Sequence, residues 1–340
     1  MFTYPVGVQL FNRPAYAKRV LASISEQSLP VDQNKLFIFI DGFKGSIYQS
    51  RGSVDKTDEV ESIAREFFPH ATVVRYEENC GIADLHNKLQ ESTFSGSDQW
   101  AAFFEEDVVL DKSYLEELSE LIDIVDDCDK VVKVACFQIL PSLSHLPRGY
   151  NGFYPGHGTK AFAERKSFFL AHQFILEEFV FLERLTDISK PFQSIKSSMV
   201  KDSFRIASLA GANALGTVIC SFNKDLALDS FLHAQGKIHI VTKPNLATDI
   251  GIEGIHNYTT PILKVSKSDV RDRQDLLGRR SEFIQALPVL IQESDQYITD
   301  NYKVILDGYY TSLSGWAMLQ KILKKSFNRV PLINRIVGIK

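Results

Sequence analysis

Residues 100–107 read WAAFFEED, an apolar segment that runs directly into three carboxylates. Similar apolar segments recur along the first 140 residues, and stretches with the apolar spacing of amphipathic helices separate them. The expected strands are 4–11, 36–40, 71–76, 100–104 and 131–138, and the expected helices are 15–27, 58–67, 82–90 and 112–124. This alternation predicts an α/β fold with a Rossmann-like, mostly parallel sheet flanked by helices on both faces.

Two residues mark expected helix starts, since Pro14 suits a first helical turn and Asp111 suits a helix cap. Outside the regular alternation, the less regular elements are expected to be a helix over 167–185, a strand over 237–242, and loops over 43–56 (mobile), 149–159 and 245–258. The predicted organisation is one continuous domain over 1–262, followed by a helical C-terminal extension over 263–340.

The composition excludes several classes of protein. The chain has 340 residues, with 38 Lys and Arg against 42 Asp and Glu, a balance that argues against a nucleic-acid partner. It has no apolar run long enough to span a bilayer and no visible signal peptide, so we expect a cytoplasmic protein. Its four cysteines are scattered, and dinucleotide-binding, zinc-protease and serine-hydrolase motifs are absent.

The C-terminal tail has a charge of its own. Residues 308–340 contain six basic residues and no acidic residue, and apolar side chains are interspersed among them. A basic amphipathic segment can lie on an anionic membrane surface, which predicts peripheral membrane association. The alternative is a terminal helix that packs on the preceding domain.

Polar residues follow the expected strands at the points where ligands bind in sheets of this kind. They are Asn12 and Arg13, Asp41 and Gly42, Asn79 to Gly81, and Glu105 to Asp107. By strand alternation, Glu105 and Asp107 should share one face, where two anions repel unless a cation or donor network compensates. A divalent ion held by one or two carboxylates and substrate phosphates would do so. The alternative is a solvated strand end that precedes a helix.

A longer series of segments extends this pattern. In chain order they are Phe11-Asn12-Arg13-Pro14, Asp41-Gly42, Asn79-Cys80-Gly81, Glu105-Glu106-Asp107, Gly156-His157-Gly158-Thr159, Asp225, Asp249-Ile250-Gly251 (24 residues after Asp225) and Gly254-Ile255-His256. The series, over about residues 4–260, resembles the metal-dependent glycosyltransferases of the GT-A fold, in particular the group that includes Golgi N-acetylglucosaminyltransferase I and related bacterial sugar transferases. Three positions depart from that pattern: Glu106 replaces an Asp, Lys224 a Trp, and Asp249 an Asn.

The resemblance implies a metal-dependent, inverting transfer of a hexosyl or N-acetylhexosaminyl group. The donor would be a nucleotide-diphosphate sugar, with UDP as the expected nucleotide, and the acceptor a glycan or glycolipid in polysaccharide biosynthesis. Asp107 and His256 would bind Mn²⁺ or Mg²⁺. The resemblance implies a donor site formed by Asn12, Arg13, Asp41, Asn79, Gly81, Glu105, Glu106, Gly158 and His256.

An inverting displacement also needs a base that deprotonates the acceptor hydroxyl. Asp225 matches that position by resemblance, and Asp229, one helical turn on, is the alternative. The departures from the family pattern also support a second hypothesis, an inactive module that binds nucleotide-sugars or glycans. A nucleotidyltransferase is a third, although Asn12-Arg13-Pro14 is not the phosphate loop with which such enzymes usually open.

Overall fold

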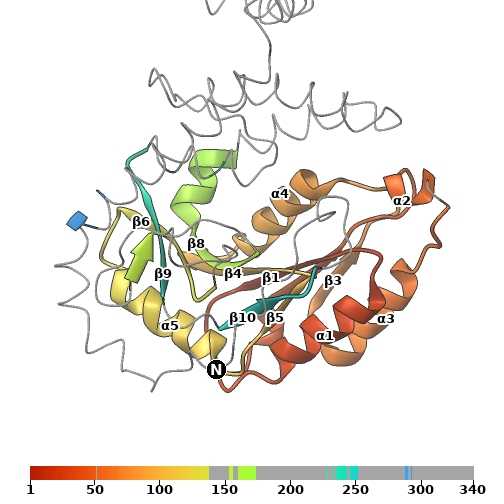
Figure 1. Cartoon of the computed structure of the whole chain (residues 1–340), viewed down its shortest axis with the longest axis horizontal. Helices are drawn as coiled ribbons and strands as arrows, with labels where there is room; N and C mark the ends of the chain where they lie inside the picture. Colours follow the sequence, from red (N-terminus) through yellow and green to blue (C-terminus); the bar gives the residue numbers. More distant parts are fainter. Residues whose placement is uncertain are drawn as a thin grey trace, which may run out of the picture.

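The computed structural model describes residues 1–50, 52–137, 153–155, 160–173, 235–242 and 246–251, together with the single positions 228, 232, 288, 289 and 292. Its centre is an eight-stranded sheet in the order β3-β2-β1-β4-β8-β6-β9-β7 (Figure 1). These strands are β1 (Val6–Leu10), β2 (Leu36–Ile40), β3 (Thr72–Arg75), β4 (Trp100–Glu105), β6 (Val131–Ala135), β7 (Phe153–Pro155), β8 (Ala161–Arg165) and β9 (Ile238–Thr242).

Most of the sheet is parallel. Strands β3, β2, β1 and β4 run in one direction, β8 lies antiparallel between β4 and β6, and β9 is parallel to β6. Strand β7 pairs antiparallel with β9. A second, two-stranded antiparallel sheet joins β5 (Val108–Leu110) and β10 (Ala247–Asp249). The predicted α/β fold with a mostly parallel sheet is therefore confirmed.

Helices cover both faces of the sheet. They are α1 (Pro14–Ser25), α2 (Ile47–Ser50), α3 (Thr57–Phe67), α4 (Ile82–Thr93) and α5 (Tyr114–Val125), with a short 3₁₀ helix over Gln33–Lys35. Figure 1 shows α1, α3 and α5 on one face, and α4 with the helical residues 166–173 on the other. Among the described residues, no helix combines the length and the apolar character needed to cross a membrane.

Strand alternation separates two cores. Val6, Val8 and Leu10 of β1 are buried in the larger core with side chains of α1, α3 and α5. Gly7 lies on the opposite face, where a Cβ would come within 2.9 Å of the Phe103 ring and 3.0 Å of Leu89. Helix α4 therefore packs closely against β1 through Leu89, where only a glycine leaves enough room.

The structure corrects several local predictions. Asp111 does not cap α5, which begins at Tyr114; its Oδ1 instead accepts from the N–H and the hydroxyl of Ser113 in the preceding turn (3.1 and 3.0 Å). The predicted loops 43–56, 149–159 and 245–258 contain α2, β7 and β10. Strands β5 and β8 were not predicted. Strands β5, β7 and β10 have three residues each, too short for a periodic apolar signal, and β8 has five but ends in the charged residues Glu164 and Arg165.

Candidate active site

The candidate site lies at the C-terminal edge of three neighbouring parallel strands. Strand β1 pairs with β2 on one side and with β4 on the other. The segments that follow them, which start at Phe11, Asp41 and Glu106, therefore lie along one edge of the sheet. This is the placement that the sequence predicted, and the contacts below show how these side chains are held.

Glu106 joins the end of β4 to the end of β1. It is 7% exposed, its Oε1 accepts from Arg13 Nε at 2.6 Å, and its Oε2 accepts from the Phe11 N–H at 2.9 Å. Burial raises the pKa of Glu106 above its ordinary value, although the nearby Arg13 guanidinium and the Phe11 N–H favour the ionised form. Because both oxygens already accept from the protein, Glu106 holds Arg13 in place, and a contact with a nucleotide ribose stays a prediction.

Asp107 has a different environment. It is 8% exposed, and its Oδ2 lies 3.0 Å from Lys160 Nζ and 4.0 Å from the Arg13 guanidinium. Within the described part of the chain, its other oxygen, Oδ1, is buried and has no hydrogen-bond partner. A buried carboxylate oxygen without a donor is costly, so it is available to a cation or a hydrogen-bond donor of a ligand.

Lys160 is the cation at this carboxylate. Its ammonium group also contacts Asp249 Oδ2 at 2.8 Å, so it bridges two aspartates. Burial acts against the charged form, but Asp107 and Asp249 outweigh it and raise the pKa of Lys160 above its ordinary value. Lys160 is therefore charged at neutral pH.

The turn after β10 presses against the same carboxylate. The Ile250 N–H donates to the Asp107 carbonyl and the Gly251 N–H to Asp249 Oδ1, both at 2.8 Å. A Cβ on Gly251 would lie 2.4 Å from Asp107 Oδ2 and 3.0 Å from Asp249 Oδ1. Only glycine fits there without moving the carboxylates, so the backbone itself forms one wall of the site.

The sequence predicted that Glu105 and Asp107 share one face of a strand, but Asp107 is not part of a strand. Strand β4 ends at Glu105, and Glu106 with Asp107 forms the turn into β5, so alternation does not extend to Asp107. The negative charge of Asp107, which was expected to need a metal ion or a network of donors, already has two cationic neighbours, Lys160 and Arg13.

A second cluster lies at the end of β2. Asp41 is 6% exposed; its Oδ1 accepts from the N–H groups of Gly42 (2.9 Å) and Cys80 (2.7 Å), and its Oδ2 accepts from Asn79 Nδ2 (2.8 Å). Burial raises the pKa of Asp41, and these hydrogen bonds oppose the rise. Asp41 thus fastens residues 79–81 to β2 immediately before α4.

Two glycines make this fastening possible. A Cβ on Gly42 would lie 2.3 to 2.6 Å from backbone atoms of Glu78, so the two segments touch through their main chains. Gly81 has φ of 82°, in the left-handed region that favours glycine, and it directly precedes the first residue of α4. Glycine is thus required at position 42 by the close approach of another main chain and favoured at position 81 by the positive φ.

Asn12 connects the end of β1 to the segment that follows β2. Its Nδ2 donates to the Val54 carbonyl at 2.8 Å, and its Oδ1 accepts from the Lys56 N–H. The Phe11 ring also packs against Tyr48 of α2, with 5.4 Å between the ring centres. The described residues of 43–56 are therefore attached to the site through Tyr48 of α2 and through the segment that follows α2, which the sequence did not predict.

The sequence reasoning missed two residues of this group. Lys160 had no local signal, because its position depends on the antiparallel pairing of β8 with β4. Asp249 was noted only as a departure from a family pattern. Four predicted site residues lie outside the described residues: Gly158, Asp225, Asp229 and His256. The predicted extension over 263–340 lies there too, apart from three single positions.

The described residues fit a divalent ion in part. They contain no cluster of three or more His, Cys, Asp or Glu side chains arranged to hold a metal. Mg²⁺, however, commonly uses only one or two carboxylates together with substrate phosphates. Asp107 offers a buried oxygen that accepts no hydrogen bond from any residue that the structure describes. Asp107 and Asp249 share one cation, Lys160, so a divalent ion would add positive charge where two carboxylates meet.

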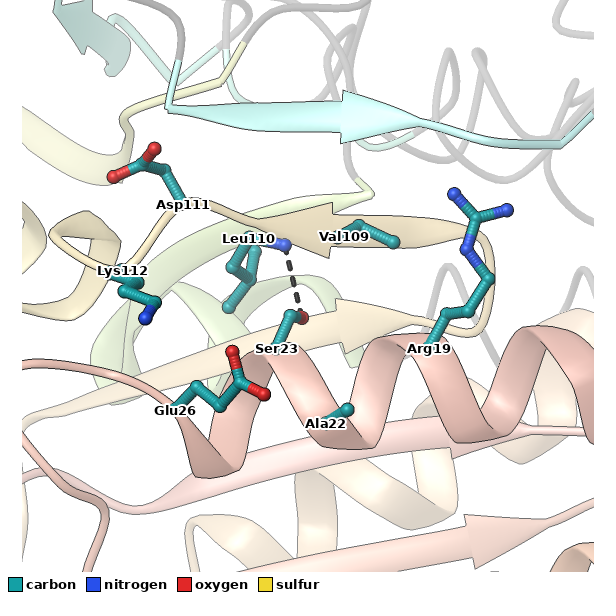
Figure 2. A pocket seen from close by; sticks show the side chains of 8 residues that line it. All are labelled: Arg19, Ala22, Ser23, Glu26, Val109, Leu110, Asp111 and Lys112. Atoms are coloured by element: carbon teal, nitrogen blue, oxygen red, sulfur yellow. Dashed lines mark hydrogen bonds between the residues drawn. The ribbon is translucent and has the colours of Figure 1, made fainter.

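A separate depression of about 330 Å³ lies between α1 and β5. Figure 2 shows that the Ser23 hydroxyl accepts from the Leu110 N–H there, at 3.1 Å. Its charged lining residues are two bases, Arg19 and Lys112, and two acids, Glu26 and Asp111. With no excess of either charge, it offers no clear ligand.

The chain is similar to known proteins at the level of solved structures. No protein family and no curated protein matches the chain. Among solved structures, it is similar to the mannosyltransferase PcManGT from Pyrobaculum calidifontis in complex with GDP-Man and Mn²⁺ (16% identity, 68% of this chain, 71% of that chain, TM-score 0.35). It is also similar to S. aureus TarS 1-349 in complex with UDP (13% identity, 91% of each chain, TM-score 0.39).

Proposed function

We propose that this chain is a glycosyltransferase that transfers a sugar from a nucleotide-diphosphate sugar. One observation carries the proposal: Asp107 lies at the C-terminal edge of β4, beside two cationic side chains, and has a buried oxygen to which no described residue donates. A carboxylate in this setting suits an ion held together with a diphosphate. The ordered series of motifs that resembles GT-A glycosyltransferases supports the same assignment.

Five residues have proposed roles at the metal and the donor. Asp107 would hold Mn²⁺ or Mg²⁺, with His256 as a second ligand, and Arg13 and Lys160 would lie near the diphosphate. When bound, the ion would stabilise the negative charge of the leaving diphosphate. Asp41 would act mainly by holding residues 79–81 where the nucleoside lies, because it accepts three hydrogen bonds from the protein.

The finer features of the reaction are also proposals. We propose an inverting displacement, UDP as the nucleotide, a hexosyl or N-acetylhexosaminyl group as the sugar, and a glycan or glycolipid as the acceptor. Asp225 would deprotonate the acceptor hydroxyl, with Asp229 as the alternative base. The basic segment 308–340 would bind an anionic membrane surface in the cytoplasm.

A panel of UDP-, GDP- and dTDP-sugars with MnCl₂ tests the proposal, with release of the nucleoside diphosphate as the readout. We expect release from at least one donor, and loss of release in Asp107→Asn. Binding of a donor by calorimetry without any release would favour the inactive binding module. If no donor binds and none is consumed, the proposal is wrong.

A further inference from the structure

Lys160 occupies the position where a cation would contact both Asp107 and Asp249. Its Nζ lies 3.0 Å from Asp107 Oδ2 and 2.8 Å from Asp249 Oδ2. We propose that Lys160 and a divalent cation compete for these two carboxylates, so that Lys160 is the resident counter-ion of the metal-free site. This assigns Lys160 and Asp249 to the cation site.

The fold fixes the two carboxylates next to each other. They are 142 positions apart in the sequence, but β5 and β10 pair in a register that sets Asp249 opposite Val108, the residue after Asp107. The bonds from Ile250 to the Asp107 carbonyl and from Gly251 to Asp249 hold the turn in place. The pairing of β5 with β10 and the turn after β10 thus position the backbone of both aspartates, and they do so without Lys160.

The charges explain why a cation is required. With Lys160 removed, the described cation nearest to Asp107 is Arg13, whose guanidinium lies 4.0 Å away and is engaged by Glu106 at 2.6 Å. Two neighbouring carboxylates disfavour each other's ionised form unless a positive charge lies between them. The site therefore gains a strong preference for an added cation once the ammonium group is gone.

Competition follows from the shared oxygen atoms. A divalent ion that binds both aspartates would take the Oδ2 atoms that the ammonium group now contacts, and two cations at the same oxygens repel each other. If the ion instead used only Asp107 Oδ1, Lys160 could stay in place. The two arrangements differ in whether removal of Lys160 changes the affinity for the metal.

The competition itself needs no substrate, but its consequence rests on the proposed function. An ammonium group displaced from the aspartates has N–H donors free for another anion, and the diphosphate of a donor is the anion expected at this edge. Lys160 would then move its contacts from the carboxylates to the diphosphate when the ion and the donor bind.

Titration calorimetry of the full chain with MnCl₂, without nucleotide, tests the proposal. We expect Lys160→Met to bind Mn²⁺ about ten-fold tighter than the natural chain, and Lys160→Arg to bind as weakly as the natural chain because it keeps the charge. Lys35→Met is the matched control, since Lys35 forms an ion pair with Asp98 at 3.0 Å outside this group of residues. It should leave the affinity unchanged.

Two outcomes would overturn the proposal. One is an unchanged or weaker affinity in Lys160→Met; the other is tight binding that persists in Asp107→Asn/Lys160→Met. Circular dichroism would check the folding of each variant, and Lys160→Gln, which keeps polar hydrogen atoms near both aspartates, serves if the methionine variant is unstable. The titration uses Mn²⁺ alone, so its result is independent of the donor assay. Tighter Mn²⁺ binding by Lys160→Met with no turnover of any donor would support the competition and reject the proposed transferase activity. Donor turnover with unchanged Mn²⁺ binding by Lys160→Met would reject the competition alone.

Discussion

At the residue scale, the missing Cβ of Gly42 lets the end of β2 contact the Glu78 backbone directly. We expect Gly42→Ala to lower the free energy of unfolding by about 2 kcal/mol, because its Cβ would lie 2.3 Å from the Glu78 backbone and must push it away. Chemical denaturation measures this change. Gly96→Ala is the control, since a Cβ there meets nothing closer than 3.7 Å, and it should change stability by less than about 0.5 kcal/mol. Equal effects of the two substitutions would contradict the close contact.

Lys160 gives a prediction about pH. Its pKa is raised in the folded protein, so its contribution to stability is fully present below the unfolded value of 10.5 and is lost as pH rises through the higher folded value. We expect Lys160→Met to lower the free energy of unfolding by about 3 kcal/mol at pH 7.5, as when one partner of a buried ion pair is removed. The difference should stay constant up to about pH 10 and shrink above it.

Denaturant unfolding of the two proteins at several pH values between 7.5 and 11.5 measures this difference. Groups that titrate in both proteins cancel in the comparison. A difference that is absent at pH 7.5, or one that grows above pH 10, would show that Lys160 is not a charged partner of Asp107 and Asp249.

Individual residues also show where sequence reasoning reached the site. Arg13, Asp41 and Asp107 could be placed together because each follows an apolar strand, and parallel strands end at one edge. Lys160 could not, because it precedes an antiparallel strand whose partner lies far away in sequence. The unpartnered oxygen of Asp107 depends on side-chain packing, which no local pattern encodes.

At the scale of elements, the predicted strands were those with an uninterrupted or nearly uninterrupted apolar run, and the predicted helices were those with helical apolar spacing. Strand β2 was predicted with its observed bounds, and helices α1, α3 and α4 within three residues of theirs. Strands β5 and β10 were missed because each has three residues and depends on the other for its backbone hydrogen bonds. This short pair is what brings Asp249 to Asp107, so the missed elements are the ones that complete the site.

The segment that carries α2 gives a prediction at this scale. Asn12 holds Val54 and Lys56 at the end of β1. We expect Asn12→Ala to free this segment, so that trypsin cleaves after Lys44 or Lys56 several-fold faster while the melting temperature changes little, because few buried contacts are lost. Mass spectrometry of limited digests measures the rates.

Asn34→Ala is the control for this experiment. Asn34 is an exposed asparagine whose side chain donates to the nearby Asp32 and makes no contact with the segment 43–56 in the described part of the chain. It should leave cleavage after Lys44 and Lys56 unchanged. If Asn12→Ala also leaves the cleavage rate unchanged, the hydrogen bonds of Asn12 do not protect this segment from trypsin.

At the scale of the whole molecule, the site is built from two groups of segments, which differ in how far apart in sequence their strand partners lie. The parallel strands β1, β2 and β4 supply Arg13, Asp41 and Asp107, while the segments beside β8 and β10 supply Lys160 and Asp249. The first part was predictable from sequence, because its strands and helices alternate. The second was not, because it depends on pairings between distant segments.

The central claim is that Asp107 binds a divalent ion together with a nucleoside diphosphate. The most direct test is thermal unfolding of the full chain with UDP or GDP, each with and without MnCl₂. A ligand that binds the folded state at one hundred times its Kd stabilises it by about 2.7 kcal/mol. The account predicts a rise in melting temperature that requires both nucleotide and Mn²⁺, that persists in the exposed-residue control Asp129→Asn, and that is lost in Asp107→Asn. The same rise in Asp107→Asn, or a full rise without Mn²⁺, would contradict it.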